Sequence, residues 1–187
     1  MRKNVGAKPY VFPMPVLIVT SYNGDGTANA MNAAWGTISD MNQISIYLSA
    51  GHKTVKNILE RKAFTVSIAD AKHVAEADYF GVISGNKVTD KVKAAGMTHA
   101  KSEFVDAPVI NEFPLALECK FISYDKESEL MLGEIVNVSI DENILTDGKI
   151  DMNKFQPISY DPANSTYHKI GEKVGNAFAD GMYLKHE

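Results

Sequence analysis

Short strand-like segments, separated by glycine and proline, are the feature that most restricts how this chain can fold. Residues 16–22 (VLIVTSY) are rich in β-branched and aromatic side chains and run into the turn sequence NGDG at residues 23–26. A second segment begins at Thr27, so we expect a β-hairpin here. Residues 43–50 and 63–69 alternate apolar and polar side chains, which is typical of half-buried strands.

Segments with helical spacing are short insertions and are fewer than the strands. They are residues 52–62, 71–82 and 89–97. Thr54 is placed to act as the N-cap of the first helix. Residues 113–124 and 131–140 predict a long strand pair. A doubly wound sheet would need regular alternation of strands and helices, so we predict instead a mainly β fold, an antiparallel barrel with peripheral helices.

Composition narrows the possible functions. The 187 residues, 45% of them hydrophobic, suffice for one globular core, and we expect a single domain over residues 1–187. One cysteine, Cys119, excludes an internal disulfide framework; we expect a buried structural thiol in a reducing, cytoplasmic setting. A net charge of −4 argues against nucleic-acid binding, and no apolar run approaches the roughly 20 residues of a membrane helix.

The first candidate binding motif is the strand-to-helix turn at residues 49–54 (SAGHKT). The first amides of a helix have no intrahelical partner, and such a helix start binds phosphate readily. Gly51 permits a tight turn, Lys53 adds positive charge and Thr54 offers a hydroxyl group. The alternative is that Thr54 only caps the helix and Lys53 is only solvated. The turn is not a P-loop, because His52 interrupts the Gly-Lys pair and the earlier glycine is missing.

The second motif is residues 29–35 (NAMNAAW), in which small and amide side chains fill an expected strand before the single tryptophan. Asparagine is disfavoured inside strands, so the pair suggests a polar edge that contacts a ligand. Small residues allow close approach of a flat heteroaromatic ring, amides can satisfy its carbonyls and nitrogens, and Trp35 can shield one side. The alternative is an irregular strand with Trp35 as a core anchor.

The third motif is the glycine-containing loop at residues 83–91 (ISGNKVTDK), which precedes a short helix. Its alternative is a plain surface loop with a solvated Lys91. The five histidines show no pair at i, i+4, which removes the commonest helical metal site. We predict no metal site and no catalytic side chain.

In order and spacing, the three motifs resemble the flavin-reductase-like family of FMN-binding split barrels, and especially its flavoredoxin-type members. The resemblance covers almost the whole chain. It runs through residues 15–22, 25–26, 29–35, 52–54, 84–85, 90–91, 107–108, 117–119, 133–136, 147–149, 157–158 and 171–175.

This resemblance implies a Greek-key split β-barrel that forms a homodimer, with FMN near the subunit interface. It implies that residues 29–35 lie along the isoalloxazine ring and ribityl chain, that the turn at residues 49–54 holds the phosphate, and that Tyr160 covers the ring. The residues that it assigns to the cofactor are Asn29, Met31, Asn32, Ala33, Trp35, Ser49, Ala50, His52, Lys53, Thr54, Ser84, Gly85, Lys91 and Tyr160.

The activity that the resemblance implies is that of an FMN oxidoreductase, with NADH or NADPH as electron donor and an unidentified small-molecule or protein acceptor. Many members carry a histidine shortly before the strand at residues 132–136, where this chain has Ser128. That departure favours the alternative of a non-enzymatic FMN electron-transfer protein, a flavoredoxin-like carrier reduced by a protein partner. A pyridoxamine-phosphate-oxidase-like enzyme shares the barrel type and phosphate ligand but fits the order of the motifs less well.

Overall fold

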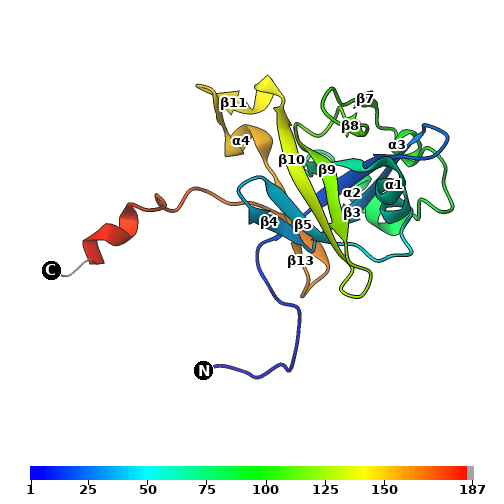
Figure 1. Ribbon diagram of the computed structural model, residues 1–187. Helices are drawn as coiled ribbons and strands as arrows, with labels where there is room; N and C mark the ends of the chain where they lie inside the picture. The colour runs from blue at the N-terminus through cyan, green and yellow to red at the C-terminus, as the bar shows by residue number, and fades with distance from the viewer. Residues whose placement is uncertain (185–187) are drawn as a thin grey trace.

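The computed structural model describes residues 1–184 of the chain. At its centre, a seven-stranded antiparallel sheet curls into a half-barrel (Figure 1). In spatial order the strands are β3 (Ala28–Ala33), β2 (Leu17–Tyr22), β6 (Ala63–Ile68), β9 (Leu115–Tyr124), β10 (Leu130–Ile140), β5 (Gln43–Tyr47) and β4 (Gly36–Asp40). The prediction of a mainly β fold with peripheral helices is confirmed.

The predicted hairpin is formed by β2 and β3. Their register pairs Leu17 with Ala33 and Tyr22 with Ala28. The Asn23 amide donates to the Thr27 carbonyl at 2.8 Å and closes the turn. β3 is an edge strand of the sheet, and its two asparagine side chains hydrogen-bond to Thr54 of the segment that follows β5 and to Ala77, outside the sheet.

The long strand pair is also present, as β9 and β10. Cys119 of β9 is fully buried beside Phe64 in the core, so the prediction of a buried structural thiol is confirmed. Burial, reinforced by the neighbouring Glu118 carboxylate, raises the pKa of the Cys119 thiol to about 12. The thiol is therefore uncharged at neutral pH and chemically inert.

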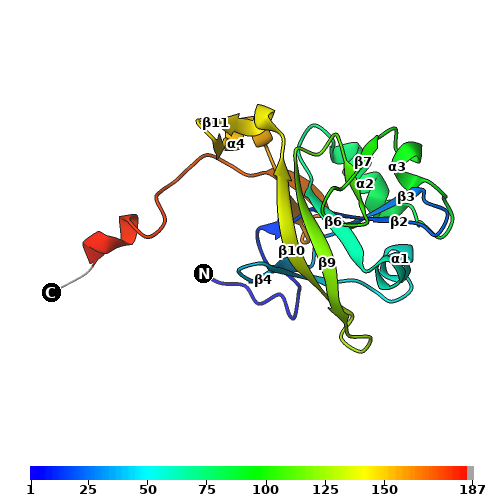
Figure 2. The same ribbon diagram turned by 45° about the horizontal axis from the view of Figure 1, so that its top comes forward.

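Three helices lie together at one end of the sheet (Figure 2). They are α1 (Lys53–Arg61), α2 (Val74–Val82) and α3 (Lys91–Ala94), each inside a predicted helical segment but shorter than it. Val55 and Ile58 of α1 join the core cluster around Phe64. Phe80 of α2 and Val92 of α3 join a second cluster behind β2 and β3. None of the helices in residues 1–184 is long and apolar enough to cross a membrane.

The remaining elements are small and lie around the half-barrel. They are β1 (Met14–Pro15), β13 (Ile158–Asp161) and β14 (Thr166–Lys169) in one sheet, the pairs β7 (His99–Lys101) with β8 (Pro108–Ile110) and β11 (Leu145–Thr146) with β12 (Lys149–Ile150), and the short helices η1 (Glu142–Ile144) and α4 (Met152–Phe155). The pairing of Met14 with Tyr160 joins the beginning of the chain to its last third.

Both terminal segments leave the body of the protein on the side of β4 (Figure 1). Residues 1–13 and 171–184 are exposed throughout. The second segment ends in the 3-10 helix η2 (Asp180–Leu184), which buries no residue. We call residues 171–184 the C-terminal arm.

Candidate functional site

A groove crosses the surface where β3, α1 and the end of α2 meet. Its central hollow has a volume of about 250 Å³. A second hollow of about 330 Å³ shares Lys53 and Gly85 with it, and a third of about 350 Å³ shares Asn32 and Gly81. The central hollow is lined by Asn29, Ala30, Met31, Asn32, His52, Lys53, Thr54, Phe80, Gly81, Val82, Ile83, Ser84, Gly85 and Lys91. The structure therefore brings all three sequence motifs to one groove.

The start of α1 forms one wall of the central hollow. The N-cap is His52, whose side chain makes no capping bond, so the prediction that Thr54 caps the helix is wrong. The helix begins at Lys53, which places Thr54 inside its first turn. There Thr54 is 2% exposed, and its hydroxyl oxygen accepts a hydrogen bond from Asn29 Nδ2 at 2.8 Å. This hydrogen bond therefore joins the first turn of α1 to β3, and Thr54 does not cap the helix.

Asn29 connects the three motifs at the bottom of the groove. It is 1% exposed, and its side chain lies between Thr54 and Gly85. A Cβ atom at position 85 would lie 2.1 Å from Asn29 Oδ1 and 3.2 Å from Lys53 Cβ. Only glycine lets the loop approach β3 and α1 this closely.

We expect Gly85→Ala to lower the free energy of unfolding by about 1–3 kcal/mol, because the added methyl group overlaps Asn29. Asn29 is fixed by its bond to Thr54, so relief requires the loop or the strand to move. Urea unfolding of the two proteins measures the difference. Gly51→Ala is the matched control, since its Cβ would meet no atom within 4 Å, and it should stay within about 0.5 kcal/mol. Equal losses in both variants would contradict the steric argument.

Lys91 is a buried cation in the groove, only 2% exposed. Its ammonium group donates to the Phe80 carbonyl, near the end of α2, at 2.8 Å. The alternative of a solvated Lys91 on a surface loop is therefore wrong, because α3 turns the side chain inward under the end of α2. An ammonium group has three donors, and the Phe80 carbonyl takes one of them.

Burial lowers the pKa of Lys91 from 10.5 to about 8, because the charged form is poorly solvated. Between about pH 8 and pH 10.5, Lys91 is mostly protonated in the unfolded chain and mostly deprotonated in the folded chain. We therefore expect the free energy of unfolding of the apoprotein to rise with pH across this window. Lys91→Met should remove that rise, whereas exposed Lys56→Met should keep it. Tyrosines that titrate in this range contribute equally to the wild type and to Lys91→Met, so their effect cancels when the two proteins are compared. Parallel curves of unfolding free energy against pH for these two proteins would contradict the prediction.

The far end of the groove is aromatic. The Tyr160 and Tyr167 ring centroids are 5.9 Å apart, and Tyr160 lines the third hollow with Asn32. Tyr167 donates from its hydroxyl group to Asp78 at 2.9 Å, and burial raises its pKa to about 12. Asn32 Nδ2 donates to the Ala77 carbonyl at 3.0 Å, which ties β3 to α2. Tyr160 thus lines the groove, and its place over a flavin ring stays a prediction.

The central hollow is electrostatically one-sided. Its titratable lining residues are His52, Lys53 and Lys91, and no acidic residue lines it within the described chain. Asp25 lies in the hollow beyond Lys53, where its carboxylate accepts from the Thr27 amide and hydroxyl at 3.0 Å and 2.6 Å. A helix start with two lysines favours an anionic or carbonyl-rich ligand over a cation or an alkyl chain.

Comparison with known proteins assigns the family. The sequence profile of the flavin reductase like domain matches residues 10–170. The chain belongs to the flavin reductase-like family.

Solved structures of this family share the fold. Flavoredoxin of Desulfovibrio vulgaris (Miyazaki F) is 38% identical, with a TM-score of 0.92 over 97% of this chain and 100% of that one. Flavoredoxin from Methanosarcina acetivorans is 27% identical, with a TM-score of 0.88 over 99% and 100%. Nitrilotriacetate monooxygenase component B from Bacillus cereus, at 23% identity and a TM-score of 0.78 over 94% and 100%, shares the fold. The predicted split barrel and the resemblance to flavin reductase-like proteins are confirmed.

Four residues that the resemblance assigned to the cofactor do not line the groove of this flavin reductase-like chain. Ala33 is buried in the core cluster around Phe64. Ser49 donates from its hydroxyl group, and Ala50 from its amide, to the Glu129 carboxylate at 2.8 Å and 3.1 Å. Trp35 is 57% exposed and lines a separate apolar groove, so the alternative of a core anchor is also wrong.

Sequence reasoning missed the contribution of α2 to the flavin reductase-like site. Phe80 and Gly81 line the central hollow, and Asp78 lines the third hollow. Asn86 was also missed; its side-chain amide donates to the Gly51 carbonyl at 3.1 Å and ties the loop to the turn before α1. The only available signal was Gly81, near the end of the helix predicted over residues 71–82. A single glycine does not indicate which part of the molecule packs against it.

Proposed function

We propose that the groove binds FMN and that the protein is an FMN oxidoreductase that accepts electrons from NADH or NADPH. The observation that carries this proposal is the central hollow, in which a helix start, two lysines and a pair of asparagines face one space. His52, Lys53 and Thr54 would hold the phosphate, with Ser49 and Ala50 at the outer side of the turn.

The residues present suit FMN in chemistry and in space. The close approach of Gly85 to Asn29 keeps the floor of the groove free of side-chain bulk, as a flat ring requires. The Lys91 ammonium group retains donors for a ring carbonyl or nitrogen, and it favours negative charge on the ligand. Asn29, Asn32 and the loop at Ser84 would follow the ring and its ribityl chain, and Tyr160 would cover it.

Bound FMN would supply the hydride and electron transfer, for which no side chain of this groove is suited. The protein's part is to hold the phosphate, to place positive charge beside the ring and to leave one face accessible. No residue of the chain needs to act as acid or base. We therefore propose binding residues and no catalytic side chain.

A second candidate is an FMN electron-transfer carrier that exchanges electrons with protein partners. Two observations favour it: the 38% identity to a flavoredoxin, and Ser128 at the position where many flavin reductases have a histidine. Ser128 lies in the turn between β9 and β10, and its amide donates to Asp125 Oδ1 at 3.0 Å. In either role we propose a cytoplasmic location, in keeping with the single, buried cysteine.

Spectroscopy of the purified protein tests both candidates. The FMN proposal expects a yellow protein, or a colourless one that binds added FMN; a protein that does neither would refute it. Anaerobic mixing with NADH and NADPH then separates the roles. Loss of the flavin band near roughly 450 nm indicates the oxidoreductase, and its persistence in excess nicotinamide indicates the carrier.

A further inference from the structure

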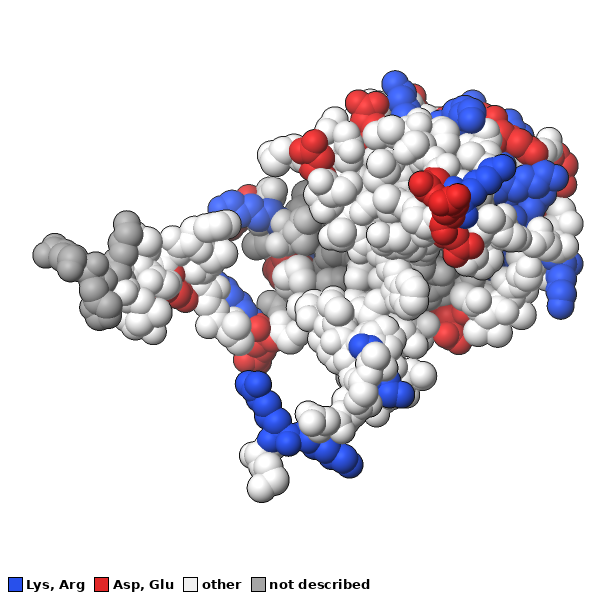
Figure 3. All heavy atoms as spheres, turned by 60° about the horizontal axis from the view of Figure 1, so that its bottom comes forward, with Lys and Arg blue, Asp and Glu red and all other residues white. Residues whose placement is uncertain are grey.

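Lys91 is the only buried lysine among residues 1–184. It is 2% exposed, and it lines the central hollow of the groove. Lys56, on α1, shows the contrast, because its side chain is 67% exposed. Figure 3 shows further lysine and arginine side chains standing on the surface of the body. The surroundings of the Lys91 amine are therefore the cavity and the protein interior, and not bulk water.

This burial changes the chemistry of the amine. The pKa of Lys91 is lowered to about 8, so at pH 7 roughly one molecule in ten carries the neutral amine, against about one in 3,000 at a pKa of 10.5. Only the neutral amine has a lone pair that can attack a carbonyl carbon. Lysines that form imines with carbonyl compounds are activated by desolvation of this kind. Lys91 therefore has the character of a nucleophile at neutral pH.

The hydrogen bond to α2 limits the directions from which the amine can react. Lys91 Nζ donates to the Phe80 carbonyl oxygen at 2.8 Å. When the neutral amine keeps this bond with one N–H, its lone pair points away from the carbonyl oxygen. Phe80 also lines the hollow, and Lys91 Nζ lies 5.8 Å from the centroid of its ring. An aromatic ring carried by the reacting carbon can therefore pack against the Phe80 ring.

The same hollow contains the start of α1. Lys53 and Thr54 line it, and the first amides of a helix have no intrahelical partner. No acidic residue of the described chain lines this hollow. A compound that reacts with Lys91 is therefore held more tightly if it carries a phosphate group that reaches the helix start. The volume of about 250 Å³ has room for one substituted ring and its phosphate.

We propose that the flavin-free protein binds a phosphorylated aromatic aldehyde covalently, as an imine on Lys91. The lysine nitrogen attacks the aldehyde carbon, the carbonyl oxygen takes up protons and leaves as water, and a carbon–nitrogen double bond remains. No oxidant or reductant is consumed. The protonated imine has one N–H, which keeps the hydrogen bond to the Phe80 carbonyl.

The adduct would fill the space that we propose for FMN, so the aldehyde and the flavin would compete. The inference uses the phosphate-binding turn of the proposed function, but it does not require that FMN binds. Its test can therefore be made on the apoprotein.

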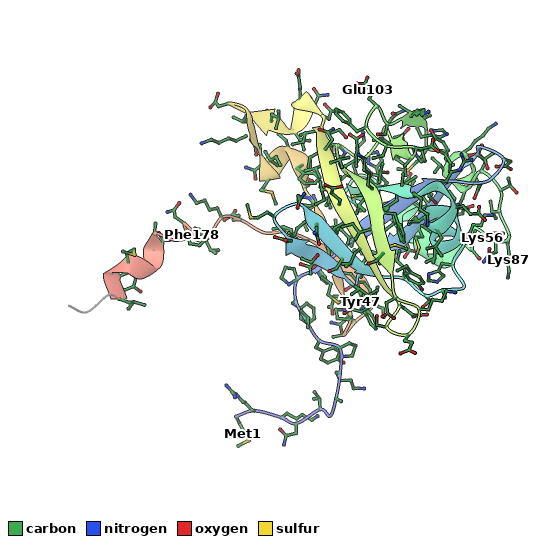
Figure 4. All side chains as sticks on the ribbon, viewed as in Figure 1. Met1, Tyr47, Lys56, Lys87, Glu103 and Phe178 are labelled. Atoms are coloured by element: carbon green, nitrogen blue, oxygen red, sulfur yellow. The ribbon has the colours of Figure 1, made fainter. Side chains whose placement is uncertain are left out.

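Reductive trapping of the full-length apoprotein tests the inference. Pyridoxal 5′-phosphate is the probe, borohydride converts the imine into a stable secondary amine, and peptide mass spectrometry locates the product. We expect labelling of Lys91 to be at least about tenfold faster than labelling of exposed Lys56, which is marked in Figure 4. Equal labelling of the two lysines would overturn the inference.

Three variants separate the amine from the phosphate site. Lys91→Arg keeps a cation that can donate to the Phe80 carbonyl but cannot form an imine, so it should lose the specific label. Lys53→Ala keeps the reactive amine and should slow its labelling at low aldehyde concentration by about tenfold. Lys56→Ala, on the exposed side of the same helix, is the matched control and should leave the labelling of Lys91 unchanged. Equal labelling of Lys91 in Lys53→Ala and Lys56→Ala would overturn the phosphate contact.

Addition of FMN before the aldehyde separates this inference from the proposed function. Saturating FMN should slow the labelling of Lys91 and leave that of Lys56 unchanged. A protein that binds FMN but is not labelled at Lys91 would overturn the inference and leave the proposed function standing. A protein that is labelled at Lys91 but binds no flavin would do the reverse. Undiminished labelling of Lys91 in the FMN-saturated protein would also overturn the inference, because the two ligands would not share the hollow.

Discussion

Replacing Lys53 and Thr54 together with alanine is expected to weaken FMN binding by about 2–4 kcal/mol, or about 30- to 900-fold. Lys53 lines both the central hollow and the hollow beside it, so its ammonium group is available to a phosphate in either. Thr54 lies in the first turn of α1, and its removal also deprives Asn29 of its 2.8 Å acceptor. Quenching of flavin fluorescence during titration with apoprotein measures the affinity.

Two comparisons separate phosphate contacts from general damage to the site. Lys56→Ala, on the exposed face of the same helix, removes a lysine that is paired with Glu60 at 4.0 Å and should change the affinity by less than about twofold. Riboflavin lacks the phosphate, so the double variant should bind FMN and riboflavin about equally while the wild type prefers FMN. An unchanged FMN affinity in the double variant would place the phosphate elsewhere.

Replacing Glu118 with alanine is expected to lower the free energy of unfolding by about 2–4 kcal/mol. Glu118 is 3% exposed on β9, and its carboxylate accepts from the Ser102 hydroxyl and from Asn137 Nδ2, the latter at 2.7 Å. Ser102 Oγ in turn accepts from the Phe104 and Val105 amides at 3.0 Å and 2.9 Å. Alanine would leave buried donors without an acceptor and would release the loop before β8 from the sheet.

Urea unfolding with two companion variants tests this role. Glu103→Ala removes an exposed glutamate from the same loop (Figure 4) and should stay within about 0.5 kcal/mol. Glu118→Gln should fall between the wild type and Glu118→Ala, because its carbonyl oxygen can still accept from Asn137 while the acceptor for Ser102 is lost. Equal stabilities for Glu118→Ala and Glu103→Ala would show that the buried bonds contribute nothing.

The strands of the half-barrel could be predicted from the sequence because their pattern is local. Alternation in residues 43–50 and the turn sequence after Tyr22 identify a strand and a hairpin without knowledge of distant contacts. The N-cap of α1 could not be predicted in the same way. Thr54 has the right chemistry for a cap, but Asn29, 25 residues earlier, takes its hydroxyl oxygen as acceptor. The helix starts at Lys53, two residues before the start that a cap at Thr54 would give.

The same difference between local patterns and distant contacts applies to the site residues. Residues with a motif of their own, such as Asn29, Lys53 and Gly85, line the groove as predicted, although their contact with FMN stays a prediction. The burial of Lys91 depends on how α3 packs under the end of α2, and no local pattern reveals it. Trp35 lies in the two-residue connection between β3 and β4, and its exposure depends on how the chain bends there, which local sequence preferences do not determine.

The buried ammonium group of Lys91 has a consequence for the protein in the cell. Its charge is poorly solvated, and no acidic residue of the described chain lines the central hollow, so an anionic ligand there would offset part of the cost of burying it. A ligand that binds only the folded state shifts the balance away from unfolded chains, which proteases degrade. If that ligand is FMN, as we propose, the amount of this protein that a cell accumulates should follow its supply of riboflavin, even at a constant rate of synthesis.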